Sequence, residues 1–175
     1  PDGTRLSFDA DYDGDGFQEI WVMNADGTSP VRLTSGRAND QWASWAPDGR
    51  RIVFSSDRAG GLDLYTMNAD GTGQVRITDD PNPEVFPEWS PTGDRIAFVT
   101  VTATPTLWTV TPSGGERTQL SSRRAEDPCW SPDGTQIAFQ DWNAGTMEIY
   151  RLTVASEEVA NLSRNAAGDF WPSWR

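Results

Sequence analysis

The sequence predicts an all-β fold: a β-propeller of four blades, each an antiparallel sheet of four strands. The first observation behind this is a Pro-Asp-Gly or Pro-Thr-Gly turn in four copies, at 1–3, 47–49, 91–93 and 132–134. Repetition at a step in the low to middle forties is typical of propeller blades. The second is a Trp two residues before three of these turns and again near the C-terminus, at Trp45, Trp89, Trp130 and Trp174. Because the repeat runs through residues 1–175, we expect a single unit.

Two alternating segments follow each turn. Apolar side chains at every second position, bounded by turn residues, indicate half-buried strands. The second segment carries an aromatic residue in the same register in all four repeats. The first strands are expected at 5–8, 51–54, 95–98 and 136–139, and the second at 19–23, 63–67, 106–110 and 148–152.

A tight turn and two further strands complete each repeat. Asp-Gly or Gly-Gly in these turns supplies the positive φ that a hairpin requires. The next strand is short and polar, which limits edge-to-edge aggregation. The last strand leads into the repeated Trp, which we assign to the core. The short strands are expected at 31–34, 75–78, 118–121 and 159–163, and the Trp-bearing strands at 41–45, 85–89, 126–130 and 170–174.

The repeats do not coincide with the two ends of the chain, so one blade is divided between them. The first repeat lacks a Trp-bearing strand, whereas the segment 170–174 is a Trp-bearing strand with no successors. Pairing the two would complete a blade, either within one chain, giving four blades, or between two chains, giving eight. Because four blades make a tight ring, we expect closure between chains and therefore a homo-oligomer. A piece cut from a longer propeller would leave the same free edges.

Composition excludes several functions. The formal net charge is −12, every basic residue is Arg, and there is no His. Such a surface repels phosphate, which disfavours nucleic acids and anionic membranes, and no apolar run is long enough for membrane insertion. Without His, a nucleophile elbow, a metalloprotease helix or a phosphate loop, we expect no enzyme. The lone Cys129 is expected to be a packed side chain.

The first repeat contains an acidic hairpin, Asp11-x-Asp13-x-Asp15-Gly16-x-x-Glu19. Alternate carboxylates in a Gly-turned loop supply the hard oxygen ligands that Ca²⁺ prefers. The sequence therefore predicts a structural calcium site whose ligands are Asp11, Asp13, Asp15, the Phe17 carbonyl and Glu19. The alternative is a solvated acidic hairpin of the kind that Asp and Gly commonly build.

Carboxylates and aromatic side chains also recur where the Trp-bearing strands begin. Radial blades would bring these positions to one rim of a central channel, where they could receive a basic peptide, a cationic group or a sugar. The alternative is that the aromatic rings pack between blades and the acids cap turns. The predicted rim consists of Asp40, Trp42, Glu84, Phe86, Glu126, Asp127, Asp169 and Trp171.

Linked motifs in these repeats resemble a known family. Trp-Ser-Pro-Asp-Gly-x-x-Ile-Ala-Phe at 130–139, Ser-Ser-Asp-Arg-x-Gly at 55–60, Leu-Tyr-x-Met-Asn-Ala-Asp-Gly-Thr at 64–72 and Arg-Ile-Thr at 76–78 resemble the TolB-like β-propeller repeat. The resemblance covers essentially the whole chain. It implies a periplasmic or secreted, non-catalytic scaffold that binds a protein or peptide at the channel rim.

Two other functions remain open at this point. Similar repeats form the substrate-gating propellers of prolyl-oligopeptidase-type peptidases, so the chain could be a gating or carbohydrate-binding accessory piece of a larger hydrolase. It could also be a purely structural repeat fragment that self-assembles. Because propellers host unrelated functions, the site has to decide between them.

Overall fold

Four antiparallel sheets form the described part of the chain, residues 1–143, 145–164 and 167–174 of a computed structural model. No helix occurs in these residues. The first blade comprises β1 (Arg5–Ala10), β2 (Glu19–Asn24) and β3 (Val31–Arg32), and the second β4 (Asp40–Trp45), β5 (Arg51–Ser56), β6 (Asp63–Asn68) and β7 (Val75–Arg76). The third comprises β8 (Glu84–Trp89), β9 (Ile96–Thr100), β10 (Thr106–Val110) and β11 (Thr118–Arg124), and the fourth β12 (Glu126–Trp130), β13 (Gln136–Asn143), β14 (Thr146–Thr153) and β15 (Glu158–Asn161).

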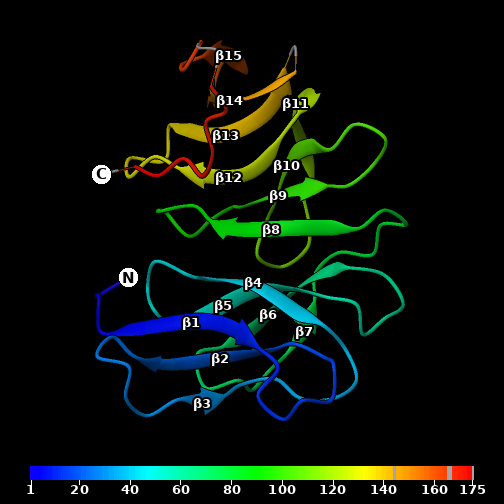
Figure 1. Cartoon of the computed structure of the whole chain (residues 1–175), viewed down its shortest axis with the longest axis vertical. Helices are drawn as coiled ribbons and strands as arrows, with labels where there is room; N and C mark the ends of the chain where they lie inside the picture. The colour runs from blue at the N-terminus through cyan, green and yellow to red at the C-terminus, as the bar shows by residue number, and fades with distance from the viewer. Residues whose placement is uncertain (144, 165–166, 175) are drawn as a thin grey trace.

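This architecture confirms the predicted all-β, four-bladed propeller (Figure 1). In each blade the strands pair in chain order, and the first sheet has three strands, as the sequence predicted. The Trp-bearing strands β4, β8 and β12 each contact the preceding blade. They are therefore the joints that connect one blade to the next.

The core lies between and within neighbouring blades. One repeat position shows this best, since Ile52, Ile96 and Ile137 are each fully buried opposite the Trp of their own blade. Burying a side chain of this size contributes roughly 1.5–3 kcal/mol. Trp89 and Trp130 are buried, which confirms their predicted place in the core, whereas Trp45 and Trp174 are half-buried.

Glycine permits the close approach of neighbouring blades. Gly71, in the hairpin of the second blade, has a φ of 86°, and a Cβ there would lie 2.7 Å from the Leu33 carbonyl oxygen of the preceding blade. A Cβ at Gly114, in the third blade, would likewise lie 2.4 Å from the Ile77 carbonyl oxygen of the second blade. The hairpin glycines therefore serve packing between blades as well as the turn itself.

The C-terminal segment corrects one expectation. Residues 170–174 form no strand but lie against the fourth blade, where the Trp174 indole N–H donates to the Cys129 carbonyl at 3.1 Å (Figure 1). No contact joins the first and fourth blades among the described strands, so the pairing with β1 within one chain is not formed. The physical reason is that each blade packs only on its neighbour, which leaves the two terminal blades apart.

Candidate functional site

One backbone conformation recurs where the chain enters each new blade. Trp42, Phe86, Asp127 and Trp171 have φ values of 55°, 54°, 47° and 51°. The first three lie where the pairing register of β4, β8 and β12 slips by a β-bulge. A bulge redirects a side chain out of the regular alternation of a strand. The same local distortion therefore presents four predicted rim residues.

These four side chains line one cavity of about 500 Å³. The rings of Trp42 and Phe86 lie 4.8 Å apart, and Trp171 is 76% exposed at the edge. The cavity is thus bordered by aromatic rings and is open to solvent. The remaining lining residues are Ala43, Ser44, Trp45, Pro87, Glu88, Pro128, Cys129 and Pro172.

The other predicted rim residues do not line this cavity. Asp40 and Glu84 are buried, and their carboxylates pair with Arg58 at 2.8 Å and Arg117 at 2.7 Å. Burial nevertheless raises the pKa of Glu84 to about 7. These two acids are therefore held within their own blades.

Glu126 and Asp169 also lie outside the cavity lining. The Glu126 carboxylate pairs with Arg124 at 2.6 Å, and the Asp169 backbone N–H donates to the Met147 carbonyl at 2.8 Å. Of the eight predicted rim residues, the structure brings together the four that have a positive φ. The acids two or one positions earlier in the chain engage other partners.

Two ionisable residues at the cavity, Glu88 and Cys129, do not belong to the predicted rim. Burial raises the pKa of Glu88 to about 7 and the pKa of the Cys129 thiol to about 11. Cys129 is partly exposed and keeps its proton at neutral pH, so it is a poor nucleophile. Both residues directly precede a repeated Trp, and that position could have drawn attention to them.

Asp127 is the second carboxylate at the cavity. Gln140 donates a hydrogen bond to it from β13, and burial raises the pKa of its carboxyl group. Among the residues that the structure describes, no arginine lines this cavity. The described lining therefore combines aromatic surface with two carboxylates and no cationic side chain.

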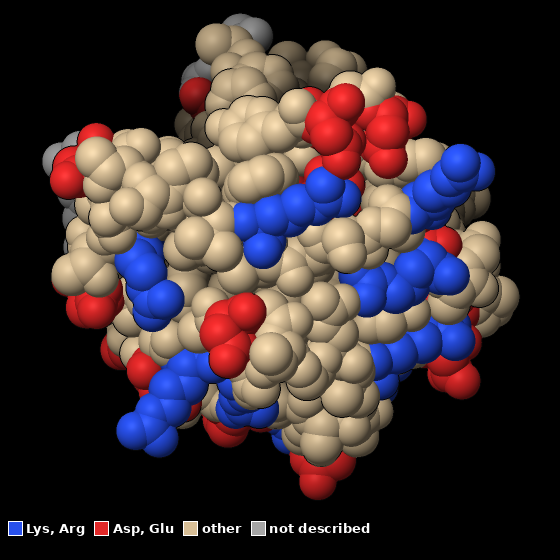
Figure 2. Space-filling view, turned by 90° about the horizontal axis from the view of Figure 1, so that it is seen from below, with Lys and Arg blue, Asp and Glu red and all other residues tan. Residues whose placement is uncertain are grey.

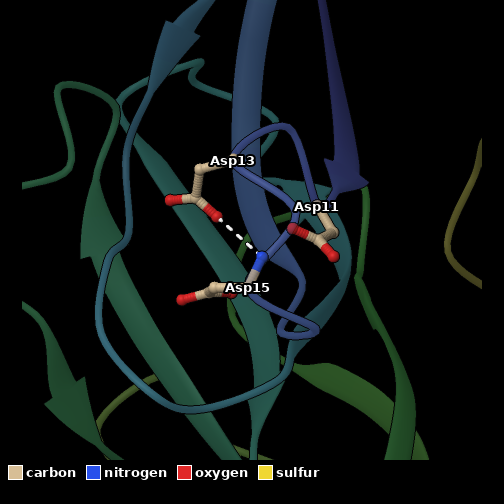
Figure 3. Close-up of side chains that lie close together, drawn as sticks. All are labelled: Asp11, Asp13 and Asp15. Carbon is tan, nitrogen blue, oxygen red and sulfur yellow. Dashed lines mark hydrogen bonds between the residues drawn. The ribbon is translucent and has the colours of Figure 1, made fainter.

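The acidic hairpin brings three of its five predicted ligands together (Figure 3). Carboxylate oxygens of Asp11, Asp13 and Asp15 lie within 4.8 Å of one another, and all three residues are exposed. The Asp11 carboxylate accepts hydrogen bonds from Gly14 N–H at 2.7 Å and Gly16 N–H at 3.0 Å. These two hydrogen bonds fix the Asp11 carboxylate within the loop.

Glu19 and Phe17 occupy different surroundings. The buried Glu19 carboxylate pairs with Arg32 and lies outside the cluster of three, and burial raises its pKa. Arg32 also donates to Asp13 at 2.7 Å, which lowers the pKa of that carboxyl group. The Phe17 backbone N–H donates to Asp15 at 3.0 Å. Arg32 is therefore a competitor for any cation at Asp13.

Arginine side chains lie beside acidic ones on the molecular face shown in Figure 2. Ion pairs of the described chain include Arg76 with Asp63 at 2.9 Å within the second blade, and Arg123 with Asp141 at 2.9 Å between the third and fourth blades. A search of the described residues for a helix able to span a bilayer returned none.

Comparison with known proteins places these features in a family. A family model described as the TolB beta propeller domain matches residues 1–127 and 62–175. The chain is 31% identical over 174 residues to an uncharacterized protein of Agrobacterium fabrum, a match that covers 98% of the chain and 44% of that protein. The chain thus spans about half the length of this relative.

Solved structures with the same fold differ in their described roles. TolB from Acinetobacter baumannii superposes with a TM-score of 0.86 at 18% identity, covering 99% of this chain and 45% of that one. A nidogen/laminin complex has a TM-score of 0.78 at 14% identity, with 99% and 64% covered. Puromycin hydrolase has a TM-score of 0.71 at 20% identity, with 92% and 27% covered. At these identities the likeness establishes the fold alone.

Proposed function

Because this chain belongs to the TolB β-propeller family, we propose that it is a non-catalytic propeller that binds a peptide or protein segment. The observation that carries this proposal is the open cavity where Trp42, Phe86, Asp127 and Trp171 converge. Concave sites with apolar walls and a few polar groups are the usual places of ligand recognition. Exposed aromatic residues such as Trp171 supply much of the binding energy in protein interfaces.

Several observations weigh against catalysis in this proposal. The cavity holds no His, and its one thiol has a pKa raised to about 11. The likeness to puromycin hydrolase covers only 27% of that protein. It is therefore as compatible with a binding or gating piece of a larger enzyme as with an enzyme. The family resemblance leads us to propose a periplasmic or secreted location.

A peptide selection tests the binding proposal. Peptides selected from a random display library on the unaltered chain should bind Trp171→Ala about tenfold more weakly or worse. Trp142→Ala is the matched control, since Trp142 is 54% exposed on β13 and does not line the cavity. Selected peptides that bind Trp171→Ala as tightly as the unaltered chain would contradict the proposal.

Self-assembly is a second proposed property, supported by the free edge of β1. Leu6 on this strand is 49% exposed, whereas its equivalents Ile52, Ile96 and Ile137 are fully buried beside a Trp-bearing strand. Trp171 already has the positive φ that Trp42, Phe86 and Asp127 have at their bulges, and Trp174 already makes the Trp contact of such a strand. We propose that this segment of a second copy pairs with β1, with Trp174 opposite Leu6.

A structural Ca²⁺ ion is the third proposal, based on the cluster of Asp11, Asp13 and Asp15. Three carboxylates within 4.8 Å repel one another unless a cation is shared between them. When bound, the ion would stabilise the hairpin between β1 and β2. Glu19 has no part in this proposal, because Arg32 holds its carboxylate.

A further inference from the structure

The buried acids of this propeller differ in how their charge is neutralised. Asp40, Asp63, Glu84 and Asp141 each form an ion pair with an arginine, and so does Glu19. Several of these arginines also stack on aromatic rings of their blade, such as Arg117 at 4.7 Å from the Trp108 ring centroid. Most buried carboxylates are thus neutralised from inside the fold.

The half-buried Glu88 forms no ion pair with an arginine of the described chain. The buried Glu148 also lacks an arginine, but its carboxylate accepts a hydrogen bond from the Ser163 hydroxyl at 2.9 Å. Glu88 lies on β8 between two cavities and lines both, the larger of about 500 Å³ and a smaller one of about 250 Å³. The equivalent positions before the other repeated Trp residues hold Ser44, Cys129 and Ser173. Glu88 therefore brings a single carboxylate to a position that is uncharged in the other repeats.

We infer that Glu88 binds the positively charged side chain, Lys or Arg, of a peptide segment seated in the larger cavity. This inference rests on the peptide-binding function proposed above and names its specificity. The rings of Trp42, Phe86 and Trp171 border the same space and favour a cation by their negative faces. Asp127 adds a second carboxylate from the neighbouring blade.

The cost of burying Glu88 supports this assignment. A carboxylate removed from water without a counter-charge destabilises a fold, and burial raises the pKa of Glu88 to about 7. A bound cation would restore the ionised form. Binding should therefore strengthen from pH 6 to pH 8, as Glu88 loses its proton. The other ionisable groups that line the two cavities are Asp127, Cys129 and the α-amino group of Pro1.

Nuclear magnetic resonance titration of the tryptophan indole signals provides the test. The probes are three blocked peptides, acetyl-Gly-Gly-X-Gly-Gly-amide, in which X is Lys, Arg or the neutral norleucine. We expect the Lys or Arg peptide to shift the Trp42 and Trp171 signals with about tenfold higher affinity than the norleucine peptide. Glu88→Gln should remove this preference, and Glu158→Gln, the same change at an exposed residue of β15 outside both cavities, should keep it.

Each outcome separates the inference from the function on which it rests. Equal affinity for all three peptides, unchanged by Glu88→Gln, would overturn the role of Glu88 while leaving peptide binding intact. A cation preference that survives Glu88→Gln but is lost in Asp127→Asn would also overturn it. Absence of any shift with all three peptides would overturn it together with the proposed function. An unchanged melting temperature at pH 4, where Glu88 is protonated in both states, would confirm that Glu88→Gln is folded.

Discussion

The indole Nε1 of Trp174 donates to the backbone carbonyl of Cys129 at 3.1 Å, as the indole Nε1 of Trp130 donates to the carbonyl of Glu88 at 3.3 Å. Two successive Trp residues thus make the same contact with the preceding Trp-bearing segment. The first belongs to a paired strand, and the second belongs to a segment that lacks a sheet of its own.

The first prediction follows from this equivalence. Light scattering should give the mass of a dimer or a larger assembly, because an unpaired β1 edge and a preformed terminal segment complement each other. Leu6→Asp should reduce the assembly to monomers by placing a charge at the new pairing. Val75→Asp is the control, since Val75 is 56% exposed on the outer strand β7. A monomeric unaltered chain over a wide concentration range would refute this prediction.

The second prediction concerns the contact between blades. Gly71→Ala should lower the free energy of unfolding by about 2–4 kcal/mol, because it combines a positive φ with overpacking against Leu33. Gly27→Ala, at the equivalent hairpin of the first blade, has a φ of 82° and open space around its Cβ. It should cost only about 1 kcal/mol. Urea denaturation measures both, and equal losses would show that the blade contact is unimportant.

The third prediction concerns the pH dependence of stability. Burial raises the pKa of Glu88 from 4.5 to about 7, so the folded state binds more protons than the unfolded state between these values. Its contribution is fully present below pH 4.5 and is lost as the pH rises through about 7. Glu88→Gln should therefore be more stable than the unaltered chain at pH 8, by about 1 kcal/mol after allowing for partial exposure.

At pH 4 the Glu88→Gln variant and the unaltered chain should have the same stability. Thermal melts of both proteins across this range provide the measurement. A variant that is less stable at pH 8 would mean that an internal cation already neutralises Glu88.

The fourth prediction concerns the acidic hairpin. Millimolar Ca²⁺ should raise the melting temperature by a few degrees, since a ligand that binds only the folded state stabilises it. Asp13→Ala should abolish the rise. Asp26→Ala is the control, because Asp26 caps a hairpin through Thr28 outside the cluster and should keep the calcium response. Identical melts in Ca²⁺ and chelator would exclude the site.

Sequence reasoning located the blades because its signals are local. Alternation predicted the burial of Ile52 and Ile96, and the Asp-Gly turns predicted the hairpins. It could not predict the bulge at Trp42 or Phe86, because neither residue type favours positive φ. The spacing predicts eight rim residues, of which four line the cavity, and their conformation depends on the packing of neighbouring blades.

The sequence also does not predict which acidic side chains form ion pairs. Asp40 and Glu84 have the same spacing as the rim aromatics, yet Arg58 and Arg117 hold them inside the blades. Glu88 reads as an ordinary strand residue until the positions of the arginines are known. Which acids lack an arginine partner depends on three-dimensional proximity, and no pattern along the sequence predicts it.

The contacts between successive blades also bear on how the number of repeats in such a protein can change. Arg5 stacks on Trp45 at 4.6 Å and Arg51 on Trp89 at 4.7 Å, each reaching from one blade to the next. Both contacts stack an arginine of one blade on the Trp of the next. An added repeat could therefore form the same contact with the repeats before and after it, and so could the repeats on either side of a deleted one. Duplication or deletion of a whole repeat could therefore lengthen or shorten this protein without requiring a new kind of contact between blades.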